Sequence, residues 1–108
     1  MIIQKYIYNL RKAMRESTDA TERETLNIKM RYAIAYRQGG DALKVFRDGF
    51  IEREIAKKYT IGAEIALTND RESKPEEYAA YQEYRIACKA KVDAKLAELK
   101  EELEAALV

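Results

Sequence analysis

The stretch that decides the fold is SKPEEYAAYQEYRIACKAKVDAKLAELKEELEAALV, residues 73–108. Its first residues are typical of a helix start. Ser73 can act as the N-cap, and Glu76 completes a capping box. Pro75 fits the first turn because the amide hydrogen that proline lacks would have no helical acceptor there. Neither proline nor glycine follows Pro75, so nothing ends the helix before residue 107. A helix over residues 74–107 is about 50 Å long at a rise of about 1.5 Å per residue.

The C-terminal half of this helix has the spacing of a coiled-coil seam, over a segment shorter than the three heptads that a coiled-coil assignment needs. Its apolar residues alternate in steps of four and three, at Val92, Leu96, Leu99, Leu103 and Ala106. Because a helix of this length outreaches the core that 108 residues can build, we expect the leucines near residue 100 to be covered by a partner. The predicted partner-binding face is therefore Leu96, Leu99, Leu103 and Leu107.

The N-terminal half of the same helix offers a second-choice partner face. It consists of tyrosines beside an arginine, residue types that are enriched where proteins bind one another: Tyr78, Tyr81, Tyr84 and Arg85. The alternative is that these side chains cover helices of their own chain, which is the favoured reading for Tyr81 and Cys88.

Upstream of residue 70 the sequence predicts three helices and a short fourth. Apolar residues at helical spacing indicate the first over 2–16, and Asp19 with Glu22 starts the second, which Gly39-Gly40 ends at residue 38. The third follows Asp41 and continues to Tyr59. Further helical turns lie at 64–67, before a loop at 68–70.

Gly49 lies inside the predicted third helix, where glycine is unfavourable, and a close helix crossing would explain it. With four Gly and one Pro, the chain lacks the turn residues of a β-fold. We predict an all-α protein with an N-terminal bundle over 1–70, three helices plus a short fourth, and a long helix over 74–107. The 108 residues form one helical domain.

Enzyme function is not expected. The chain has no His, one Cys and no phosphate-binding glycine motif, so the usual general bases, nucleophilic pairs and nucleotide cradles are missing. A carboxylate metal cage was considered, but acidic residues after a helix start are ordinary partners of the helix dipole: Glu72, Glu76, Glu77 and Glu83. We therefore predict no catalytic residue, no metal site and no cofactor.

Nucleic-acid binding is the alternative function. Residues 1–60 hold 13 Lys and Arg against 8 Asp and Glu, whereas residues 61–108 hold 7 against 11. In the basic half, cations that could contact phosphates lie near Tyr32 and Tyr36, on which bases could stack. The candidate residues are Arg23, Lys29, Arg31, Arg37, Arg47, Arg53, Lys57 and Lys58. Solvation of helix faces explains the same residues, and nearby glutamates would repel phosphate.

The single cysteine fits a reducing compartment, since no disulfide can form within the chain. The N-terminal MIIQKYIYNL is interpreted as a helix start, not as a secretory signal, because polar residues interrupt its apolar stretch. No apolar run approaches the roughly 20 residues of a membrane span. We expect a cytoplasmic protein with no membrane contact.

One segment carries a family resemblance. Residues 59–92 contain Glu77, Tyr78, Tyr81, Tyr84, Cys88 and Lys89 after a short helix and a loop. This pattern resembles the C-terminal part of small helical proteins from phages and prophages of Gram-positive bacteria. The resemblance implies a phage origin and a binding role in the host cytoplasm, such as a virion accessory or an inhibitor of a host protein. The predicted function is a non-enzymatic protein-interaction module that also self-associates through its C-terminal helix.

Overall fold

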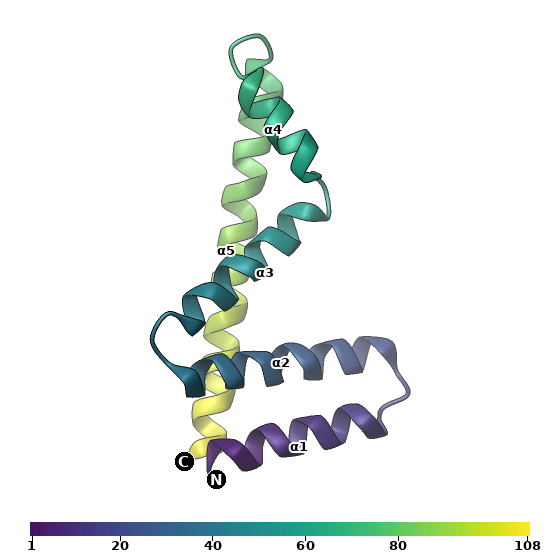
Figure 1. The fold of residues 1–108 in the computed structure, drawn as a ribbon, viewed down its shortest axis with the longest axis vertical. Helices are drawn as coiled ribbons and strands as arrows, with labels where there is room; N and C mark the ends of the chain where they lie inside the picture. The colour runs from purple at the N-terminus through teal and green to yellow at the C-terminus, as the bar shows by residue number, and fades with distance from the viewer. The chain divides into compact units, whose positions relative to one another are not determined.

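The computed structural model describes all residues, 1–108. It contains five helices and no strand: α1 (Ile3–Glu16), α2 (Ala20–Gln38), α3 (Ala42–Ala56), α4 (Ile61–Asn69) and α5 (Pro75–Leu107) (Figure 1). The predicted all-α class and the long C-terminal helix are confirmed. No helix is both long enough and apolar enough to pass through a membrane.

The chain packs as two compact units. The first contains residues 1–46 and 96–108, and the second contains residues 47–95. Helix α5 therefore supplies residues to both units, and most of α3 belongs to the second. Residues 1–70 do not form a unit of their own, because the C-terminal turns of α5 are part of the first unit's core.

The ends of α2 lie where the sequence places them. The Asp19 carboxylate accepts a hydrogen bond from the Thr21 amide at 2.9 Å, which satisfies one of the unpaired donors of the first turn. At the other end Gly39 adopts a φ of 67°, and its amide donates to the Ala35 carbonyl. A residue with a Cβ is strained at such a positive φ, so glycine ends the helix here.

Four local expectations were wrong. The helical turns predicted at 64–67 are part of a longer helix, α4 (Ile61–Asn69), which includes residues 68 and 69 of the predicted loop. Helix α3 ends at Ala56 and not at Tyr59, because the chain tightens into a turn in which the Lys57 amide donates to the Glu54 carbonyl. Helix α5 begins at Pro75 without a Ser73 cap, since the Ser73 hydroxyl donates to the Asp70 carbonyl at 3.0 Å. No helix crosses closely at Gly49, where an added Cβ would meet only the Arg53 guanidinium at 3.5 Å.

The core of the first unit corrects the main expectation about α5. Helices α1 and α2 lie antiparallel (Figure 1). Leu99 and Leu103 of α5 pack with Ile7, Tyr32 and Ala33. Leu99 is 3% exposed and Leu103 is 0% exposed, so both are covered by their own chain. The partly buried side chains against the same cluster include Leu96 and Leu107. The expectation that the leucines lack cover within the chain was therefore wrong for Leu99 and Leu103, whereas Leu96 and Leu107 are only partly covered.

Polar and aromatic contacts complete this unit. The Lys29 Nζ atom lies 2.8 Å from the Glu102 Oε1 atom, which pairs α2 with α5. The Tyr32 ring meets the Phe46 ring edge-on, with centroids 5.9 Å apart, and the Tyr36 ring at 6.2 Å. Aromatic pairs at these distances add to the stabilisation from buried area.

Candidate functional site

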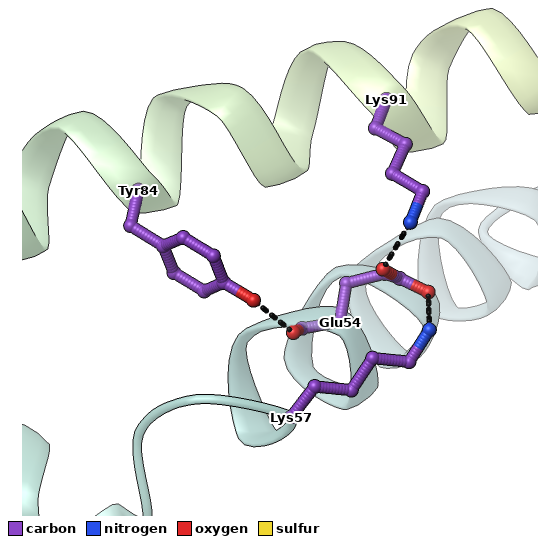
Figure 2. A network of polar contacts seen from close by, with 4 residues as sticks. All are labelled: Glu54, Lys57, Tyr84 and Lys91. Carbon is purple, nitrogen blue, oxygen red and sulfur yellow. Dashed lines mark hydrogen bonds and ion pairs between the residues drawn. The ribbon is translucent and has the colours of Figure 1, made fainter.

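The second unit contains a buried carboxylate that joins α3 to α5. Glu54 is 8% exposed, between the buried Ile51 and Ile55. Its carboxylate accepts hydrogen bonds from Lys57 Nζ at 2.6 Å and Lys91 Nζ at 3.0 Å, and the Tyr84 hydroxyl donates to its backbone carbonyl at 3.1 Å (Figure 2). A buried charge is tolerated when it is paired and hydrogen-bonded in this way.

The electrostatics of this network favour the ionised carboxylate. Burial by itself would raise the pKa of Glu54, but the hydrogen bonds and charges of Lys57 and Lys91 together lower it below its ordinary value. The pKa of Lys91 is raised in turn, mainly by its hydrogen bond to Glu54. The network therefore stabilises the packing of α3 on α5 without offering a proton to a substrate near neutral pH.

A tyrosine cluster lies beside this network. The Tyr59 ring is 5.0 Å from the Tyr81 ring and 5.5 Å from the Tyr84 ring, and Tyr78 is 6.3 Å from Tyr81. The buried Tyr81 hydroxyl donates to Glu64 Oε1 at 2.6 Å. Burial, followed by that hydrogen bond, raises the pKa of Tyr81 to about 12. The predicted tyrosine face is thus largely internal to the unit, where it connects α5 with α4 and with Tyr59.

A groove of about 740 Å³ opens in the second unit between α3, α5 and the first turns of α4. Its wall combines apolar and charged side chains. The apolar part consists of Ile51, Ile55, Ala56, Tyr59 and Ile61, with Gly49. The charged part consists of the cations Arg47, Arg53, Arg85 and Lys89 and the anions Asp48, Glu52 and Glu64. A pocket with apolar walls and a few polar groups is the usual form of a binding site.

Arg85 is the unusual member of this groove. Its guanidinium lies 5.7 Å from the centre of the Tyr81 ring, while its Nε atom is buried and has no hydrogen-bond partner. Nearly all buried polar groups in proteins are hydrogen-bonded, and an unpaired one costs about 1–3 kcal/mol. Of the second-choice face, Arg85 lines the groove, whereas Tyr78, Tyr81 and Tyr84 do not.

The eight basic residues predicted for nucleic-acid binding are divided between the units. Arg23, Lys29, Arg31 and Arg37 belong to the first, and the other four to the second. Several of the eight are engaged within the protein, notably Lys29 with Glu102, Arg47 with Asp93 at 2.7 Å, and Lys57 with Glu54. The remaining pair of the second unit lies over aromatic rings, Arg53 over Phe50 and Lys58 over Tyr59 and Tyr84.

Sequence reasoning missed both the groove and the buried carboxylate. From the sequence we predict of the glutamates near these basic residues only that they would repel phosphate, although Ile51 and Ile55 flank Glu54 at helical spacing. That flanking was the available signal. The sequence pattern of a single helix does not predict the groove, because residues of three helices form its wall.

Comparison with known proteins gives no identification. No family model matches the chain, and neither a curated protein nor a solved structure does.

Proposed function

We propose that this chain is a non-enzymatic protein-interaction module whose second unit binds a segment of a partner protein in the α3–α4–α5 groove. The observation that carries the proposal is the groove itself, whose wall places the Arg85 guanidinium beside apolar side chains. A carboxylate or carbonyl oxygen of the partner would accept from the guanidinium, while an apolar side chain of the partner would cover Ile61, which is 76% exposed.

The exposed apolar residues of α4 support a protein partner. Ile61 at the groove is 76% exposed, and Ile65 on the next turn of the same face is 57% exposed. Isoleucines four residues apart on one face provide apolar contact area next to the groove. The cations and anions of the wall are nearly balanced in number, which suits a polypeptide of mixed charge better than a polyphosphate.

Two predictions from the sequence, self-association and the resemblance to phage proteins, bear on this proposal in different ways. Self-association through the C-terminal helix is not part of it, because Leu99 and Leu103 have cover within their own unit. The resemblance of residues 59–92 to phage proteins supports a host protein as the partner, because part of that segment lines the groove.

Nucleic-acid binding is the less supported alternative. On α2, Arg31 and Arg37 are exposed and would be free to contact phosphates. In the second unit, however, Arg47 and Lys57 already pair with carboxylates, and phosphate would have to compete with Asp93 and Glu54. Protein binding is therefore the better-supported proposal.

The test is selection of peptides from a random library on the purified protein, followed by affinity measurements on variants. We expect selected peptides to combine an apolar residue with a carboxylate. Arg85→Gln should weaken their binding by about tenfold, the effect of losing one charge-assisted hydrogen bond. Arg71→Gln is the matched control, because Arg71 is exposed in the same unit and does not line the groove.

A readout on the free protein separates a binding role from a structural one. Because the Nε atom of Arg85 has no partner to lose, Arg85→Gln should leave the thermal midpoint of the free protein within a few degrees of wild type. Selected peptides that bind Arg85→Gln and wild type equally would contradict the proposed site. Failure to select any peptide on the folded protein would contradict the proposed function.

A further inference from the structure

A second hollow lies in the first unit, between α1 and α2. It measures about 310 Å³ and is lined by three arginines and two methionines: Arg11, Met14, Arg15, Arg23 and Met30. No carboxylate lines it. Arg11 and Arg15 are four residues apart and so lie on one face of α1, and Arg23 approaches from α2.

The three arginines have no partner within the protein. None of them forms an ion pair or a side-chain hydrogen bond, in contrast to Lys29 in the same unit, which pairs with Glu102. Glu24 lines an adjoining hollow together with Arg23, yet the two side chains form no ion pair. The three guanidinium groups are therefore not held in ion pairs with carboxylates of the same protein.

This arrangement works against the stability of the free protein. Like charges four residues apart on a helix repel each other, as Arg11 and Arg15 do. Arg23 lies in the first turn of α2, where the helix dipole disfavours a cation. Only Arg15, in the last turn of α1, has a favourable place relative to its helix dipole. Folding alone does not account for Arg11 and Arg23, whereas a bound anionic group would.

The lining also indicates the kind of anionic partner. Guanidinium groups bind carboxylates through two parallel hydrogen bonds, and methionine provides an adaptable apolar surface. No aromatic side chain lines the hollow, so it has no platform on which a nucleic-acid base could stack. Carboxylates beside an apolar side chain match all five lining residues.

We infer that the α1–α2 hollow is a second binding site, for an acidic polypeptide segment that carries an apolar residue. The site is independent of the proposed α3–α4–α5 groove, because none of its residues belongs to the second unit. The partner's carboxylates would bind Arg11, Arg15 and Arg23, and its apolar side chain would contact Met14 and Met30.

The test uses a fluorescein-labelled peptide of repeated glutamate and leucine as the probe, with its glutamine-leucine counterpart as the uncharged control. Binding is measured by fluorescence anisotropy at low salt. The double variant Arg11→Gln with Arg23→Gln should weaken binding of the acidic peptide by about tenfold or more, because two charge-assisted contacts are lost. Lys12→Gln with Arg37→Gln removes the same charge from the same two helices outside the hollow, and it should retain binding.

Two further measurements make the result specific. The proposed groove can also bind a glutamate–leucine peptide, so the double variant is compared in the Arg85→Gln background as well. Binding of the acidic peptide should persist in Arg85→Gln alone, and Arg11→Gln with Arg23→Gln should still weaken it there, which separates this site from the groove. The thermal midpoint of Arg11→Gln with Arg23→Gln should equal or exceed that of wild type, because repulsion is relieved.

Equal loss of binding in both double variants would overturn the inference, since the attraction would then be general to basic residues. No binding of the acidic peptide to wild type would also overturn it. So would binding of a single-stranded oligonucleotide, but not the peptide, through the same arginines.

Discussion

Glu54 is a buried carboxylate that joins two helices, and its burial predicts how the stability of the protein depends on pH. Sequence periodicity does not reveal this burial, because the cover comes from α5, which packs against that part of α3. The structure buries its carboxylate with Lys57 and Lys91 as donors. Tyr81 is the opposite case, since its helical spacing with Cys88 favoured cover by the same chain, and both residues are 4% exposed.

The lowered pKa of Glu54 predicts how stability depends on pH. The folded protein keeps this carboxylate ionised at a pH where the unfolded chain, with an ordinary value of 4.5, has begun to bind the proton. The stabilisation is therefore complete well above pH 4.5 and is lost as the pH falls through the folded pKa. Glu54→Gln should lower the free energy of unfolding by about 1–3 kcal/mol near neutral pH.

The measurement is urea unfolding of wild type and Glu54→Gln at neutral and acidic pH. The difference between them should shrink as the pH falls below 4.5. Glu52→Gln is the matched control, because Glu52 lies on the same helix, is exposed and forms no ion pair; its difference from wild type should stay small. A Glu54→Gln difference that does not change with pH would show that the lysine pairing does not stabilise the folded protein.

At the scale of single helices, local chemistry predicted the limits of α2 well and those of α3 poorly. Asp19 and Gly39 act within one turn of the helix ends that they define, so the sequence contains the whole reason for both. The apolar series of α3 continues to Tyr59, but Tyr59 contacts Tyr81 and Tyr84 from the turn after the helix. Its place is decided by a tertiary contact, which helical periodicity cannot distinguish from one more helical turn.

Two glycines give opposite predictions about helix stability. Gly49 has helical φ and ordinary space for a Cβ, so Gly49→Ala should raise the free energy of unfolding by about 1 kcal/mol. Gly39 has a φ of 67°, and Gly39→Ala should lower that free energy by about 1–2 kcal/mol through backbone strain. Denaturant unfolding of Gly49→Ala and Gly39→Ala measures whether the free energy of unfolding rises in the first and falls in the second. Destabilisation by Gly49→Ala would mean that the protein holds α3 in a tighter contact than this structure contains.

At the scale of the whole molecule, the charge asymmetry of the sequence does not carry over to the packed units. The first unit contains ten Lys and Arg against nine Asp and Glu, and the second contains ten of each. The halves differ along the chain because acidic residues gather in the segment that forms α5, whose two parts pack in different units. The net charge of each half of the sequence therefore does not predict a nucleic-acid surface. The local positive charge at Arg11, Arg15 and Arg23 remains, although the net charge of the first unit is close to zero.

The same packing reverses the expected effect of charging the α5 leucines. In an exposed seam, Leu103→Lys would reduce assembly and leave the fold intact. In the core of the first unit, where Leu103 is 0% exposed, it places an ammonium group among Ile7, Tyr32 and Leu99. Loss of the buried leucine costs about 2–5 kcal/mol before the charge is counted. We therefore expect Leu103→Lys to lose helical circular dichroism and a cooperative thermal transition.

Ala105→Lys is the matched control, since residue 105 is exposed on the same helix end and should accept the charge without loss of structure. Light scattering on wild type completes the comparison. With Leu99 and Leu103 already covered, α5 supplies no reason for association, and the expected mass is that of one chain, 12.5 kDa. A larger wild-type mass that Leu103→Lys reduces to 12.5 kDa with helicity intact would restore the seam and contradict the packing of this core.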